Sequence, residues 1–87
     1  MFTRYTPSVE EPMIHSRFED LRRAKAWREK RDLPLRLIAQ ETGLSVNAIQ
    51  RIRNSTVERI HLTTLEALCR YFAVKSISEL IEYTPAE

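Results

Sequence analysis

Four polar side chains between residues 47 and 54 have the types and the spacing that suit hydrogen bonding to another molecule. They are Asn47, Gln50, Arg51 and Asn54. A helix turns by about 100° per residue, so these four share one side, opposite the apolar Ala48, Ile49 and Ile52. Asparagine and glutamine can hold an adenine edge with two hydrogen bonds, and arginine can do the same with guanine. Each residue alone is also an ordinary solvated side chain, and only the cluster favours contact with bases.

A helix over about residues 45–54 must carry this face, and a tight turn precedes it. Gly43 is the only glycine of the chain, and glycine enters the left-handed conformation that ends many helices without steric cost. Ser45 suits the N-cap position, and Leu44 with Ile49 matches the hydrophobic staple of a helix start. Apolar residues over 34–42 recur at three and four positions, as on one face of a short helix. The stretch therefore predicts a helix-turn-helix.

The flanking segments predict three more helices. The first is expected over about residues 17–31, after the capping box Ser16–Glu19, and Pro34 should end it by disfavouring a helical Leu33. Its core stripe recurs every third residue: Phe18, Leu21, Ala24 and Trp27. Two more capping boxes, Thr63–Glu66 and Ser76–Glu79, precede apolar patterns, the last with Ile77, Leu80 and Ile81 facing inward. These patterns predict an all-α fold, a compact bundle of five helices.

The first 15 residues differ from the rest, because they contain Pro7 and Pro12 and no sustained period. We expect residues 1–15 to form a loosely ordered N-terminal arm and residues 16–87 to form the folded domain. The arm is too apolar for a pure spacer, since it holds Phe2, Tyr5 and Val9. It is therefore expected to pack on its own domain or on a protein partner.

Composition narrows the function further. The chain has one cysteine and two distant histidines, which predicts no disulfide, no metal site and no cofactor. Cys69 lies on an apolar helix face and is expected to be a buried structural thiol. No apolar run reaches about 18 residues and no signal pattern opens the chain, so we expect a cytoplasmic protein without a membrane span. Paired carboxylates, a glycine-rich phosphate loop and a nucleophile–base pair are missing, which argues against an enzyme.

Charge is distributed unevenly along the chain. Residues 17–59 hold eleven basic and six acidic residues, whereas residues 60–87 hold two basic and four acidic ones. A basic first part suits a polyanionic partner on one side of the domain. The alternative is a solvated helix face of mixed charge, which fits Arg22, Arg23, Lys25 and Arg28 at least as well.

The segment QETGLSVNAIQRIRN resembles the second helix, turn and recognition helix of phage repressor and Cro type helix-turn-helix regulators, the XRE family. The matching residues are Ile38, Ala39, Thr42, Gly43, Ser45, Ile49, Ile52 and Asn54. The likeness extends over about residues 18–83. The chain departs from the family pattern at two places. Ser55 stands where family members often have glycine after the recognition-helix asparagine. Pro34-Leu35 stands where they often have a glutamine that contacts a phosphate, and the neighbouring Arg36 is placed to make that contact instead.

This resemblance implies a lambda-repressor-like fold and a transcriptional regulator, such as a repressor, that binds double-stranded DNA as a homodimer. Base edges would be met by Val46, Asn47, Gln50 and Arg51. Phosphates would be met by Arg36, Ser45, Arg53, Asn54 and Arg59. The alternative is a protein-interaction module, such as an antitoxin or a regulatory subunit, that keeps the same fold but acts on another protein through the apolar arm.

Overall fold

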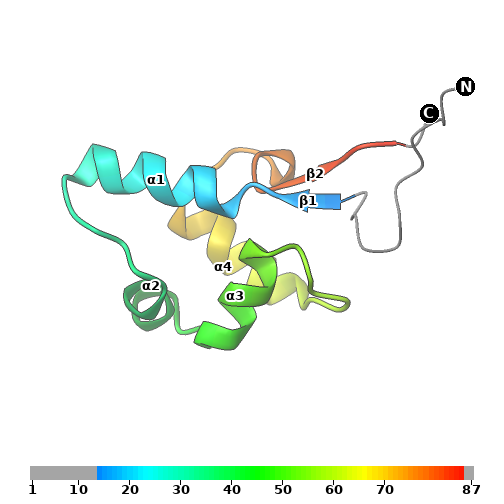
Figure 1. Ribbon diagram of the computed structural model, residues 1–87, viewed down its shortest axis with the longest axis horizontal. Helices are drawn as coiled ribbons and strands as arrows, with labels where there is room; N and C mark the ends of the chain where they lie inside the picture. Colours follow the sequence, from blue (N-terminus) through cyan, green and yellow to red (C-terminus); the bar gives the residue numbers. More distant parts are fainter. Residues whose placement is uncertain (1–13, 86–87) are drawn as a thin grey trace, which may run out of the picture.

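The computed structural model describes residues 14–85, and Figure 1 shows how their elements are arranged. The elements are β1 (Ile14–Ser16), α1 (Phe18–Glu29), α2 (Leu35–Thr42), α3 (Val46–Arg53), α4 (Leu62–Tyr71), the 3-10 turn η1 (Ile77–Glu79) and β2 (Ile81–Tyr83). Helices α2 and α3 lie below α1 in this view, and the two strands extend from one end of the helical body (Figure 1). No helix in this range is both long and apolar enough to cross a membrane.

The core joins all the helices through eight apolar side chains that are almost fully buried. These are Phe18, Leu33, Ile38, Ile49, Ile52, Leu68, Phe72 and Leu80. Phe18 and Phe72 meet edge to face with their ring centroids 5.3 Å apart, which joins the start of α1 to the end of α4. Leu33, held outside the helix by Pro34, is fully buried beneath the α1–α2 connection. The helix-turn-helix thus rests on a single small core.

The C-terminal end corrects the prediction of five helices. The described residues form four α-helices, and the expected fifth is a single 3-10 turn followed by a strand. The Ser76 hydroxyl caps this turn by accepting from the Ser78 N–H (3.2 Å), and the Glu79 carboxylate accepts from the Lys75 N–H (3.1 Å). The chain then leaves the helical path because β2 pairs antiparallel with β1. A partner more than 60 residues away therefore overrides the local helical pattern.

The strand β1 also includes the end of the segment expected to be an arm. Ile14 and His15 pair with Tyr83 and Glu82, and Ser16 pairs with Ile81. The remaining arm residues, 1–13, lie outside the described part of the chain.

Helix α1 contradicts the prediction that Trp27 belongs to the core, because its side chain is 81% exposed. Ala24 is exposed as well. A repeat of three residues drifts by about 60° per step around a helix, so Trp27, nine residues after Phe18, lies about 180° away from it. Phe18 keeps the buried position, and Trp27 faces solvent.

None of the three capping boxes forms as predicted. At the third, the Ser76 hydroxyl and the Glu79 carboxylate each accept from the N–H one residue before the one that a capping box requires. Helix α1 begins at Phe18 with Arg17 as its N-cap, and the Ser16 hydroxyl accepts from the Phe18 N–H (3.1 Å) outside the helix. Helix α4 begins at Leu62, before the expected box, and its N-cap is His61. In α1 the expected partner Glu19 instead binds Arg22 and Arg23, so competing ion pairs replace the cap.

Glu41 ties three elements together at the surface. Its carboxylate accepts hydrogen bonds from Arg31, just after α1 (3.0 and 3.2 Å), and from the Tyr71 hydroxyl of α4 (2.6 Å). The bond from Arg31 lowers the pKa of Glu41, and the bond from Tyr71 lowers it further. Burial, together with the neighbouring carboxylate, raises the pKa of Tyr71. The contact holds α2, the first helix of the helix-turn-helix, against its neighbours.

Candidate nucleic-acid interface

The turn between α2 and α3 confirms the prediction for Gly43. This residue ends α2 in the left-handed conformation with φ +80° and ψ 8°, and its N–H donates to the Ala39 carbonyl (2.8 Å). A Cβ built at Gly43 would meet no atom within 4 Å. The requirement for glycine is therefore one of backbone conformation and not of space.

Ser45 begins α3 as predicted. Its side-chain oxygen accepts from the Ala48 N–H (3.1 Å), which satisfies one of the free donors at the helix start. Leu44 and Ile49 pack in or against the core, as a hydrophobic staple requires. These two contacts fix the angle at which α3 leaves the turn.

The outer face of α3 carries the residues expected to meet base edges. Ile49 and Ile52 are 0% and 2% exposed on the inner side, whereas Asn47, Gln50 and Arg51 are exposed on the outer side. Val46 is 37% exposed at the first position of the helix. The structure therefore brings all four of the predicted base-contacting residues to one open helix face.

The residues predicted to contact phosphates surround this face. Arg36 lies in the first turn of α2, and Arg59 lies in the connection after α3; both are exposed. Arg53 is half-buried, and its Nε donates to the Asn54 side-chain oxygen (3.2 Å), which leaves the Asn54 amide group as a donor. Ser45 uses its oxygen as an acceptor for the cap, so its O–H proton remains for an outside acceptor.

Ion pairing separates the basic residues into two groups. Five basic residues in α1 or directly beside it have acidic partners: Arg17, Arg22, Arg23, Lys25 and Arg31. Within residues 14–85, none of the recorded salt bridges involves Arg36, Arg51 or Arg59. The positive charge around α3 is therefore less compensated than that of α1, which suits a polyanion at this face.

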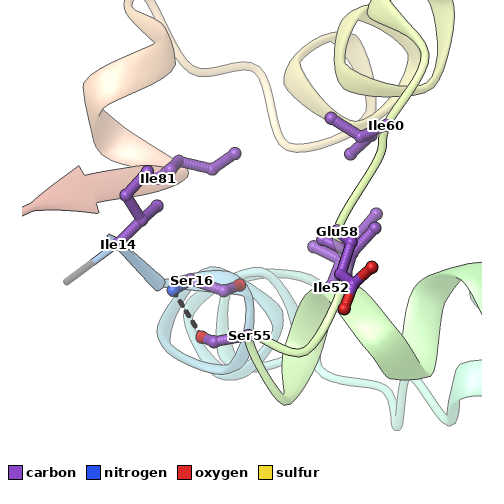
Figure 2. Close-up of a pocket in the computed structure, with 8 residues that line it drawn as sticks. Ile14, Ser16, Ile52, Ser55, Glu58, Ile60 and Ile81 are labelled. Atoms are coloured by element: carbon purple, nitrogen blue, oxygen red, sulfur yellow. Dashed lines mark hydrogen bonds between the residues drawn. The ribbon is translucent and has the colours of Figure 1, made fainter. Parts of the chain in front are cut away.

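Sequence reasoning missed the contact that secures the far end of α3. Ser55 adopts a left-handed conformation with φ 59°, and its hydroxyl oxygen accepts from the backbone N–H of Ser16 (2.9 Å). The Thr56 N–H bonds to the Arg51 carbonyl (2.9 Å), and the Ser55 N–H bonds to Ile52 (3.1 Å), which completes a Schellman motif. The signal in the sequence was Ser55 itself. It stands where similar sequences often have glycine, and its hydroxyl group adds a hydrogen-bonding group that glycine lacks (Figure 2).

Other polar groups offer no rival site in the described range. No cluster of three or more histidine, cysteine or acidic residues in 14–85 could hold a metal ion. Cys69 is half-buried on α4, and this burial raises the pKa of its thiol, so the thiol is less reactive than an exposed one.

The arrangement defines a helix-turn-helix domain whose second helix presents an open polar face. More narrowly, the chain belongs to the family of Cro/C1-type HTH DNA-binding domains, which it matches over residues 19–86. A search of curated proteins and a search of solved structures each returned no match.

Proposed function

We propose that this protein is a sequence-specific transcriptional regulator of prokaryotic or phage type that binds double-stranded DNA in the cytoplasm. Helix α3 would lie in the major groove, where Val46, Asn47, Gln50 and Arg51 meet base edges. The observation that carries the proposal is the open face of α3: three side chains able to hold bases bidentately are exposed together, directly after a fixed turn.

Phosphate contacts would position this helix without reading sequence. Arg36 and Arg59 lie on either side of α3 along the chain and are exposed, and Ser45, Arg53 and Asn54 lie at its two ends. Contacts of this kind set the register of a protein on the duplex and supply the salt dependence of binding. The bound protein would act sterically, by excluding or recruiting polymerase.

The test compares two groups of alanine variants on a selected site and on a scrambled duplex. Loss of a bidentate base contact costs about 1–3 kcal/mol on the preferred site and little on random DNA. We therefore expect Arg51→Ala and Asn47→Ala to lower the ratio of specific to nonspecific affinity. Arg36→Ala and Arg59→Ala should weaken both duplexes alike and reduce the salt slope by about one unit each.

Selection of sites from a random DNA library supplies the preferred duplex for this test. If Arg51→Ala weakens both duplexes equally, Arg51 binds phosphate and α3 does not lie in the groove as proposed. If the wild-type protein shows no salt-dependent binding to any duplex, the protein-interaction module replaces the DNA-reading function.

A further inference from the structure

The outer side of α1 carries an exposed tryptophan among basic side chains. Trp27 is 81% exposed and lines an open depression towards the C-terminal end of the helix. The other side chains of this depression include four basic ones and one acidic one: Arg22, Arg23, Lys30, Arg31 and Asp32. Tryptophan and arginine are the residue types that most often dominate the binding energy of protein interfaces. The depression therefore has the composition of a docking surface.

Two exposed cations near Trp27 take part in none of the salt bridges recorded within residues 14–85. They are Arg28 and Lys30. The Lys30 N–H donates to the Trp27 carbonyl (3.3 Å), so the backbone itself closes this end of α1 and the Lys30 side chain is not needed there. An anionic partner would therefore find charge beside the indole that no acidic side chain of the described range already neutralises.

This surface faces away from the helix that is proposed to read DNA. Phe18 of α1 and Ile49 of α3 lie in the same core, and α3 lies below α1 in Figure 1. Trp27 comes nine residues after Phe18, which turns it about 180° away from the core, and Asn47 and Gln50 lie on the side of α3 opposite Ile49. A molecule bound to one of these surfaces leaves the other open.

We propose that the outer surface of α1 docks an acidic segment of another protein. An apolar side chain of that segment packs on the Trp27 indole, and its carboxylates pair with Lys30 and Arg28. The charge of the surface carries this assignment, since four of the five charged side chains of the depression are basic. If the proposed function holds, on which this last step rests, the regulator brings that second protein to its DNA site.

The acidic residues of the same surface favour a protein segment over a nucleic-acid strand. A strand carries a phosphate at every nucleotide and suits a continuous basic track. Here Asp32 lies within the depression, and Glu19 and Glu29 hold the neighbouring arginines. A protein segment can place neutral side chains against these carboxylates and acidic ones against the free cations.

The test uses the full chain and two synthetic peptides that lack tryptophan. One contains glutamate, leucine and serine, and the other has glutamine in place of each glutamate. Trp27 is the only tryptophan of the chain, so its emission reports this surface directly. We expect the acidic peptide to shift the Trp27 emission to the blue and to protect it from acrylamide quenching, with less effect as the salt concentration rises. The glutamine peptide should cause neither change.

Anisotropy of the dye-labelled acidic peptide measures the contribution of each residue. Trp27→Ser should weaken binding by about tenfold or more, as expected at the centre of an interface. Lys30→Glu should weaken it by about threefold or more at low salt. The matched control is Lys75→Glu, which makes the same change of charge at an exposed lysine outside the depression and should bind like the wild type. All three residues are exposed, so the variants should keep the far-UV circular dichroism of the wild type.

Equal binding of the two peptides, or wild-type affinity in Trp27→Ser or Lys30→Glu, overturns the proposal. A single-stranded oligonucleotide that shifts the Trp27 emission more than the acidic peptide does, or an emission that shifts with protein concentration alone, gives the surface to a nucleic acid or to a second copy and also overturns it. A saturating duplex that displaces the peptide would have the same meaning. Peptide binding without DNA binding would contradict the proposed function and support this surface, whereas DNA binding without peptide binding would do the reverse.

Discussion

Replacement of Gly43 by alanine isolates the conformational requirement of the turn. The residue sits at φ +80°, and an added Cβ would meet nothing within 4 Å. The substitution therefore introduces backbone strain and no clash. The variant should retain the fold and lose stability by an amount that can be estimated in advance.

Two terms of opposite sign set this amount. A non-glycine residue in the left-handed region costs about 1–2 kcal/mol. Alanine also restricts the unfolded chain, which returns about 0.4–1 kcal/mol. The net loss is on the order of 1 kcal/mol, which for a domain of this size lowers Tm by about 4–8 °C. Gly43→Val should cost more, since a β-branched side chain tolerates this region poorly, and it should also reduce DNA affinity by displacing α3.

The opposite substitution provides a matched control in the same protein. Ala73 follows α4 with φ 56°, so it also ends a helix in the left-handed conformation, here with the Val74 N–H bonded to the Cys69 carbonyl (3.1 Å). Ala73→Gly should therefore raise Tm by a few degrees, because the two terms change sign. Chemical denaturation with thermal melting measures both variants. An unchanged Tm for Gly43→Ala, or a decrease in Tm for Ala73→Gly, would refute the argument from backbone strain.

Three further predictions concern other contacts. Ser55→Ala should lower the free energy of unfolding by about 1 kcal/mol, because it loses the hydrogen bond from the Ser16 N–H and keeps the backbone strain. Ser55→Gly should be near neutral, because relief of the strain offsets the lost hydrogen bond, and equal losses for the two variants in a denaturant titration would contradict this. Trp27→Ser should change stability by no more than about 0.5 kcal/mol, and native Trp27 should fluoresce as a solvated indole; a blue-shifted native emission would place it in a packed environment. Because the pKa of Glu41 is lowered in the folded protein, this carboxylate stabilises the fold above pH 4.5, its ordinary pKa, and the stabilisation is lost as the pH falls below that value. Glu41→Gln should therefore flatten the acid side of a curve of stability against pH. An unchanged curve would show that the hydrogen bonds from Arg31 and Tyr71 do not stabilise the protein.

The helix-turn-helix could be predicted because its determinants are local. A single glycine, an N-cap serine and a proline before α2 act on their own neighbours, and each adopts the role that its chemistry suggests. The exposed face of α3 follows in turn from the burial of Ile49 and Ile52. Which partner these exposed residues contact is a separate matter, because exposure alone does not define a bound molecule.

The wrong predictions have two sources: distant segments that decide the local structure, and a misjudged helical period. The pattern over residues 76–83 is compatible with a helix, but β2 forms because β1 offers a strand to pair with from the other end of the chain. The prediction that Trp27 is buried is wrong because it rests on a repeat of three residues. Such a repeat stays close to the helical period of 3.6 residues for one step but has turned to the opposite side of the helix after three steps. The bond between Ser16 and Ser55 joins residues 39 positions apart, and neither residue signals its partner locally.

Helix α3 has eight residues, and isolated helices shorter than about 12–15 residues are marginal in water. Its persistence must therefore come from tertiary contacts, and these lie on one side and at the two ends. Ile49 and Ile52 anchor the inner face, Ser45 caps the start, and Ser55 joins the far end to β1. The outer side chains carry almost none of this stabilisation. Substitutions at Asn47 or Gln50 should consequently change which molecule is recognised while leaving the fold intact. In this helix the buried residues and the end contacts stabilise the fold, and the exposed residues are free to contact a ligand.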